Sequence, residues 1–147
     1  MKILYTAFKG IHNTSLQLVS GVEKEALYLT NSFSGLHKDI SSVNGDYDAV
    51  IMFGVDKNLS NQIRLEACAE YHGDLLCTDF NIAEFGRKCT EKLIPYSLSH
   101  HPTAYLCNAA YYHMLKKIPN TVFVHIPSEK GMSERFMQKL KVLIECE

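Results

Sequence analysis

The chain has 147 residues, of which 46% are hydrophobic and 21% charged, a balance typical of one globular domain with a single core. Lysine and arginine number 15 against 16 acidic residues, and this formal charge of −1 excludes the strongly basic composition of nucleic-acid-binding proteins. No apolar run approaches the roughly 20 residues of a membrane span. We therefore expect neither a nucleic acid nor a membrane as partner.

The N-terminal part alternates strand-like and helix-like segments. Residues 2–8 are a short apolar run typical of a buried strand, and residues 13–22 have helical spacing behind a cap at one of their first two positions. Residues 26–29 and 48–53 are further strand candidates, and the second is continuously apolar, as parallel strands covered on both faces are. A short helix is predicted between them.

A two-residue period follows over residues 62–71, where apolar and polar side chains alternate. The pattern predicts one strand that carries Glu66 and Glu70 on its polar face. Residues 72–94 show no clear period, and we leave their structure unassigned.

The C-terminal part is more regular. Residues 107–118 have an apolar stripe at helical spacing, with Cys107 at the start of the helix. Residues 121–126 form a β-branched strand that contains His125, and Ser133 caps a last helix. The alternation of strands and helices predicts a three-layer α/β/α sandwich with a mainly parallel central sheet, formed by residues 1–147 as one domain.

Three side chains in these elements suggest catalysis. A thiol at a helix N-terminus lies beside free backbone N–H groups, which should lower the pKa of Cys107 and could hold an oxyanion. His125 lies where a strand ends, the place at which functional groups gather in α/β sheets. Glu66 could accept a hydrogen bond from the second imidazole nitrogen and so orient the base.

Two motifs resemble pyroglutamyl peptidase I, also called pyrrolidone-carboxylate peptidase. The segment Thr103-Ala104-Tyr105-Leu106-Cys107-Asn108 is similar to the nucleophile motif of this family. The segment Val122-Phe123-Val124-His125-Ile126-Pro127 is similar to its histidine motif. The resemblance implies Cys107 as nucleophile and His125 as base.

The other matches are partial. Ile63-Arg64-Leu65-Glu66 resembles the family's Ile-x-x-Glu and implies Glu66 as third member of the triad, with Glu70 as the alternative. The arginine that usually follows this glutamate is absent, because Ala67 stands there. Near the N-terminus, Phe8 and Asn13 match the substrate-binding region, although the family's aromatic loop is shortened. The resemblance therefore implies a shortened, divergent member.

The resemblance implies a cysteine hydrolase that cleaves an amide bond after an N-terminal pyroglutamyl or similar small group. It needs no metal or organic cofactor, acts on a peptide or small amide, and is a homo-oligomer. The five cysteines are an odd number without paired spacing, which predicts free thiols in a reducing, cytoplasmic compartment.

Two alternatives remain open. Cys68, His72 and Cys77, together with His100 and His101, could supply zinc ligands, although their spacing fits no standard zinc module. The chain could also be a catalytically silent relative that keeps the scaffold for binding or assembly, which the absent arginine and the shortened loop would suit.

Overall fold

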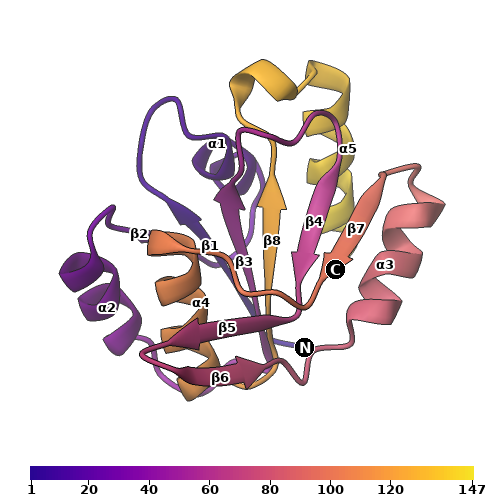
Figure 1. The fold of residues 1–147 in the computed structure, drawn as a ribbon. Helices are drawn as coiled ribbons and strands as arrows, with labels where there is room; N and C mark the ends of the chain where they lie inside the picture. Colours follow the sequence, from indigo (N-terminus) through magenta and orange to yellow (C-terminus); the bar gives the residue numbers. More distant parts are fainter.

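The centre of the molecule is a six-stranded sheet in the order β2-β1-β3-β8-β4-β7, seen in a computed structural model that describes all residues 1–147 (Figure 1). Four neighbouring strands are parallel: β2 (Ala26–Leu29), β1 (Ile3–Phe8), β3 (Ala49–Val55) and β8 (Thr121–Ile126). β4 (Ile63–Glu66) runs antiparallel to β8, and β7 (Tyr96–Ser99) runs parallel to β4. The sheet is thus mainly parallel, as predicted.

Helices cover both faces of this sheet, so the predicted three-layer α/β/α sandwich is confirmed. One apolar cluster packs α1 (Thr14–Ser20), α3 (Ile82–Glu91) and α5 (Glu134–Glu145) against one face. A second cluster packs α2 (Phe33–Ser41) and α4 (Tyr105–Lys117) against the other. A short 3₁₀ turn, η1 (Glu129–Gly131), precedes α5. No helix is both long and apolar enough to cross a bilayer.

Strand alternation decides which side chains meet α4. Val122, Val124 and Ile126 of β8 belong to the α1/α3/α5 cluster, whereas Phe123 belongs to the α2/α4 cluster. Because successive side chains of a strand point to opposite faces, His125 faces α4 as Phe123 does. The face that carries α2 and α4 is therefore the one on which the candidate catalytic side chains gather.

The predicted strand over residues 62–71 is in fact two strands. β4 ends at Glu66, and the chain turns at Ala67 into β5 (Cys68–Tyr71), which pairs with β6 (Asp74–Cys77) in a separate two-stranded sheet. This hairpin packs on α4 (Figure 1). The unassigned segment 72–94 consists mainly of β6 and α3.

Side-chain caps explain where four of the five helices begin. Asn13, Ser32, Asn81 and Ser133 each accept a hydrogen bond from a backbone N–H in the first turn of α1, α2, α3 and α5. The residue before α4 is Ala104, which has no side-chain cap. The first N–H groups of α4 thus lack the acceptor that the other helices have.

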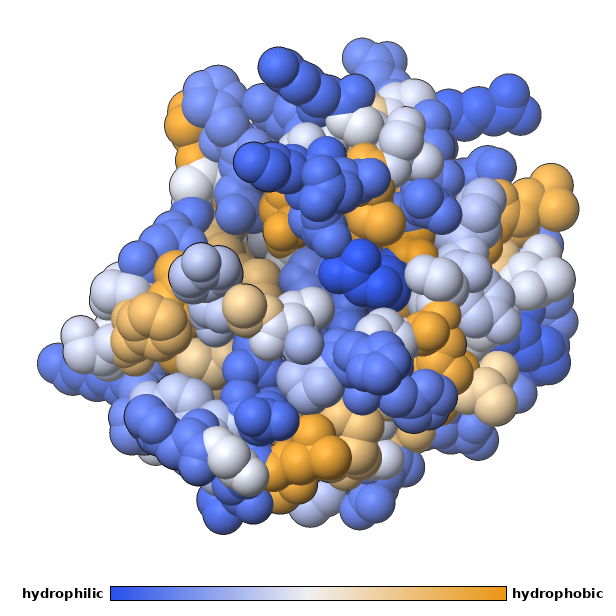
Figure 2. Space-filling view, in the orientation of Figure 1, coloured by the Kyte–Doolittle hydropathy of each residue, from blue (hydrophilic) through white to orange (hydrophobic).

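The surface on the side drawn in Figure 2 alternates between polar and apolar residues, and its apolar patches are small. The large apolar side chains most exposed outside the chain's first residue are Tyr105 at 82%, Ile11 at 81% and Leu93 at 75%. Tyr105 begins α4 and stands two residues before Cys107. An exposed aromatic ring therefore stands near the start of this helix.

Candidate active site

His125 and Glu66 form a buried ion-pair-like contact across two neighbouring strands. His125 Nδ1 lies 2.9 Å from Glu66 Oε2, and the two side chains are only 5% and 2% exposed. A carboxylate can only accept, so Nδ1 carries the proton and the other ring nitrogen, Nε2, is left as an acceptor. This is the tautomer that a general base requires.

Cys107 lies on the same face of the sheet, over Gly54. A Cβ atom placed on Gly54 would be 2.8 Å from Cys107 Sγ and 2.6 Å from Cζ of Phe123, so only glycine fits there. Gly54 pairs in register with His125 between β3 and β8. The thiol therefore lies beside the strand position that carries the imidazole, although no hydrogen bond joins the two side chains in this structure.

The electrostatic environment of Cys107 differs from the expectation. Burial, with further contributions from the carboxylates of Glu66 and Asp56, raises the pKa of the Cys107 thiol from 9.0 to about 12, and Arg64 only partly opposes this. The predicted lowering of this pKa by the helix N-terminus is wrong, because removal from water and two nearby negative charges both disfavour the thiolate. Burial and these two charges therefore favour the neutral thiol at Cys107.

Arg64 is a site residue that sequence reasoning missed. Its Nε lies 2.5 Å from Glu66 Oε2, and its Nη2 lies 2.9 Å from Asp56 Oδ2. Burial disfavours ionisation of Asp56, but the Asn58 backbone N–H and the guanidinium together hold the pKa of Asp56 below its usual value. The signal was present in the motif Ile63-Arg64-Leu65-Glu66, where alternation puts the arginine and the glutamate on one face.

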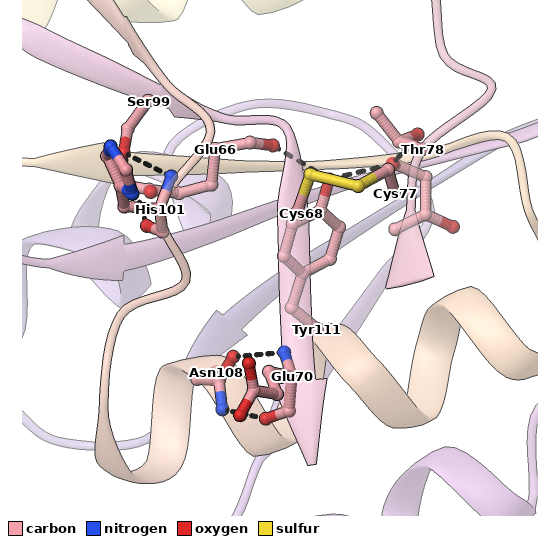
Figure 3. The surroundings of a disulfide bond; sticks show 10 residues. Glu66, Cys68, Glu70, Cys77, Thr78, Ser99, His101, Asn108 and Tyr111 are labelled. Carbon is pink, nitrogen blue, oxygen red and sulfur yellow. Dashed lines mark hydrogen bonds between the residues drawn. A yellow bond between two sulfur atoms is a disulfide. The ribbon is translucent and has the colours of Figure 1, made fainter. Parts of the chain in front are cut away.

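The alternative orienting residue, Glu70, occupies another place. It is exposed on β5, where its backbone N–H donates to Asn108 Oδ1 at 2.9 Å and its carbonyl accepts from Asn108 Nδ2 at 2.5 Å. Figure 3 shows Glu66 and Glu70 well separated, with Glu70 beside Asn108. Asn108 therefore ties the residue next to Cys107 to the β5–β6 hairpin.

The main chain of Glu66 is also fixed. The hydroxyl of Tyr111, on α4, donates to the carbonyl oxygen of Glu66 at 2.7 Å (Figure 3). The backbone of Ala67, the next residue, donates to the carbonyl of Ser99 on β7. The carboxylate thus extends from a backbone held by both α4 and the edge of the sheet.

Cys68 and Cys77 form a disulfide across the hairpin (Figure 3). The expectation of five free thiols is therefore wrong, because only Cys89, Cys107 and Cys146 are free. The antiparallel register that puts residues 68 and 77 opposite each other could not be read from their spacing. The disulfide also removes part of the argument for a reducing compartment.

The zinc alternative has no structural basis. Its two cysteines are joined to each other, and no group of three or more His, Cys, Asp or Glu side chains in the chain is arranged to hold a metal ion. His72 lies in the turn of the hairpin, with a positive φ of 50°.

Of the two residues expected to bind substrate, Phe8 is buried in the core and Asn13 caps a helix. Phe8 is 4% exposed and belongs to the apolar cluster against which Leu106 and Cys107 pack. Asn13 caps α1, and its Oδ1 accepts from the N–H and the hydroxyl of Ser15. Phe8 is thus buried in the same apolar cluster as the start of α4, whereas the side-chain oxygen of Asn13 is engaged within its own turn.

The protein is an α/β sandwich in which a helix-borne cysteine, a strand-borne histidine and a buried glutamate lie on one face of a mixed sheet. Several solved structures have the same fold. Pyrrolidone carboxyl peptidase from Thermus thermophilus has a TM-score of 0.78 and 20% identity, with 99% of this chain and 98% of that chain covered. Pyrrolidone carboxyl peptidase from Thermococcus litoralis has a TM-score of 0.76 and 14% identity, with 98% of this chain and 91% of that chain covered. Pyroglutamyl peptidase I from Bacillus amyloliquefaciens has a TM-score of 0.75 and 16% identity, with 98% of this chain and 91% of that chain covered.

This chain therefore has the fold of the pyrrolidone carboxyl peptidases, as its motifs predict, and the low identities fit a divergent sequence. No family model and no curated protein matches the sequence.

Proposed function

We propose that this protein is a cysteine peptidase or amidase of the pyroglutamyl-peptidase type, with Cys107 as nucleophile, His125 as general base and Glu66 as the group that orients His125. The observation that carries the proposal is the 2.9 Å contact between Glu66 Oε2 and His125 Nδ1, on the face where the Cys107 thiol packs over Gly54. The fold shared with known pyrrolidone carboxyl peptidases supports the same substrate class, an N-terminal pyroglutamyl or similar small group.

The first half-reaction acylates the enzyme. Because the pKa of Cys107 is raised to about 12, the thiol is protonated at rest, and His125 Nε2 must remove its proton as the sulfur attacks the scissile carbonyl. Glu66 stabilises the imidazolium that forms. The uncapped N–H groups at the start of α4 are available to stabilise the oxyanion.

The second half-reaction releases the acyl group. The imidazolium of His125 protonates the leaving amine, which departs and leaves a thioester on Cys107. The same imidazole then activates a water molecule that hydrolyses the thioester and restores the thiol. Every proton transfer uses His125, so no metal ion or organic cofactor enters the mechanism.

On the substrate side, the proposal gives Phe8 an indirect role. Its ring is buried in the cluster that supports Leu106 and Cys107, so it shapes the apolar wall of the acyl site. Asn13 would contribute through the turn that it caps. A peptide or small-amide substrate, a homo-oligomeric state and a cytoplasmic location complete the proposal.

Hydrolysis of an L-pyroglutamyl coumarylamide tests this function. Wild-type protein should release the fluorophore and Cys107→Ala should not, while Cys146→Ala, which removes an exposed free cysteine, should match the wild type. Glu66→Gln should lower turnover by about 10² or more, as in other triads whose carboxylate becomes an amide. Glu70→Gln should change little. Equal turnover by Cys107→Ala and wild type would end the cysteine-hydrolase proposal.

A catalytically silent relative is the second candidate. It is favoured by the raised pKa of Cys107 and by the lack of a hydrogen bond between its thiol and His125. Incubation with an L-pyroglutamyl chloromethyl ketone separates the two, because only a working nucleophile and base would alkylate Cys107 faster than a reagent without the pyroglutamyl group does. No hydrolysis and no such preference would support the silent scaffold.

A further inference from the structure

We propose that Arg64 is a positioning residue of this site, which holds the Glu66 carboxylate against His125 and thereby fixes the proton of His125 on Nδ1. The consequence for catalysis rests on the function proposed above. The effect on the imidazole itself does not, because it can be measured without turnover.

The geometry on β4 gives the first argument. Arg64 and Glu66 are two residues apart on one strand, so their side chains lie on the same face, and Arg64 Nε contacts Glu66 Oε2 at 2.5 Å. His125 Nδ1 contacts the same oxygen. Arg64 is also the residue directly opposite His125 in the antiparallel β4–β8 register. One carboxylate oxygen is therefore held between a permanent cation and the imidazole.

Asp56 gives the guanidinium a second attachment. Its Oδ2 lies 2.9 Å from Arg64 Nη2. Asp56 is itself fixed, because its Oδ1 accepts from the Asn58 N–H at 2.9 Å and its own N–H donates to the Ile126 carbonyl. Arg64 thus links the end of β3 to β4 beside His125, and its guanidinium group contacts a carboxylate on each side of that link.

Burial makes this cation necessary. Glu66 is 2% exposed, and its second oxygen, Oε1, has no hydrogen-bond partner. A buried carboxylate is costly unless a positive charge or several donors compensate it. The neutral imidazole of His125 supplies only one N–H. Arg64 is the only cation that contacts the carboxylate.

The other groups around Glu66 do not replace Arg64. Asp56, after β3, and the Cys107 thiol, on α4, are acidic groups and add no positive charge. Tyr111, also on α4, binds the backbone carbonyl of Glu66 rather than its carboxylate. Ser99 of β7, opposite Glu66 in register, is neutral.

Loss of Arg64 would release the hydrogen bond to the imidazole. Without its Nε contact, the Glu66 side chain is no longer held with Oε2 against His125 Nδ1. An imidazole that lacks this acceptor no longer has its proton fixed on Nδ1 and can carry it on Nε2 instead. In that tautomer Nε2 could no longer accept the proton of the Cys107 thiol. Arg64 lies two residues before Glu66. It would in this way supply a positive charge beside the glutamate, where Ala67, the residue after it, carries none.

Heteronuclear NMR of protein with isotope-labelled histidine tests the inference directly, because protonated and unprotonated ring nitrogens give distinct signals. A spectrum of His125→Gln identifies the His125 signals. In wild-type protein Nδ1 should be the protonated nitrogen, and in Arg64→Met the proton should move to Nε2. Arg64→Lys, which keeps a cation, should restore the wild-type pattern at least partly.

Arg87→Met is the matched control. Arg87 on α3 also binds two carboxylates, Glu84 and Glu91, but it is exposed and lies on the opposite side of the sheet. This variant should leave the His125 signals unchanged. Should Arg64→Met not fold, Arg64→Gln takes its place, because it also removes the cation and keeps a polar side chain of similar length. An unchanged Nδ1 proton in the folded variant would overturn the inference.

Kinetics then measure the consequence for catalysis. In Arg64→Met the kcat for the pyroglutamyl coumarylamide should fall about 10- to 100-fold, the usual effect of removing a group that orients a functional imidazole, with KM little changed. If wild-type protein shows no hydrolysis, the proposed function fails while the NMR result still decides the role of Arg64. A tautomer change without loss of kcat in an active enzyme would limit Arg64 to structure.

Discussion

The protonation state of Cys107 can be measured through its rate of alkylation as a function of pH. Iodoacetamide reacts with the thiolate, so its rate follows the thiolate fraction. With a pKa raised from 9.0 to about 12, Cys107 should have about a thousandfold smaller thiolate fraction near neutral pH than a thiol with the ordinary value. The raised pKa comes chiefly from burial, with contributions from Glu66 and Asp56.

The shape of the pH profile separates this effect from poor access. Restricted access lowers every rate by the same factor, whereas a raised pKa moves the pH at which the rate levels off. We expect the Cys107 rate to increase about tenfold per pH unit up to about pH 10 without a plateau, while a cysteine peptide levels off above about pH 8.5. Peptide mass spectrometry of a Cys146→Ser variant, with circular dichroism at each pH, gives the rates for folded protein.

Two results would refute the reasoning. Rapid alkylation of Cys107 at about pH 6 to 7, lost in His125→Ala, would show a thiolate–imidazolium pair at rest. A plateau near pH 8.5 in the folded protein would show that neither burial nor the two carboxylates disfavour the thiolate. The first outcome would replace the general-base mechanism proposed above with attack by a preformed thiolate.

Three further predictions concern stability and can be measured by urea unfolding. Gly54→Ala should cost about 1–3 kcal/mol, because its Cβ would collide with Cys107 Sγ and the Phe123 ring; an unchanged midpoint would contradict this packing. Reduction of the Cys68–Cys77 bond should lower the free energy of unfolding by about 3 kcal/mol, from the entropy of the short loop it closes, and equal curves with and without dithiothreitol would refute it. Asn13→Ala should cost about 1 kcal/mol as a lost helix cap; a raised KM at unchanged stability would instead assign Asn13 to substrate binding.

The elements that sequence reasoning predicted well are those whose signals are local. Residues 26–29 and 121–126 are strands with the predicted limits, because short β-branched or apolar runs there are bounded by polar residues or, after residue 126, by a proline. Ser133 caps α5 as expected. The helix that carries Cys107 begins at Tyr105 rather than at the cysteine, since nothing in the side chains before it marks a cap.

The features that escaped prediction depend on pairing between distant segments. The alternation over residues 62–71 continues through Ala67, so it does not show that the pairing partner changes from β8 to β6 there. The disulfide depends on the hairpin register. The raised pKa of Cys107 depends on burial in the folded chain, and on two carboxylates that the fold brings from residues 56 and 66. In each case the side-chain pattern in the sequence is local, whereas the structural feature is caused by contacts between segments that are distant in the sequence.

The reversed direction of β4 has a consequence for which insertions and deletions the chain can tolerate. Because β4 runs against β8, Arg64 is opposite His125 and Glu66 is opposite Phe123, so Glu66 reaches the imidazole from deeper in the sheet. A slip of one residue would turn Glu66 to the α1/α3/α5 face, and a slip of two would change its depth. Residues 59–62, which form part of the connection between β3 and β4, can change in length without either effect if Asp56, its contact with Asn58 and the β4 register are kept. Length variation among relatives should therefore fall within this connection and not within β4.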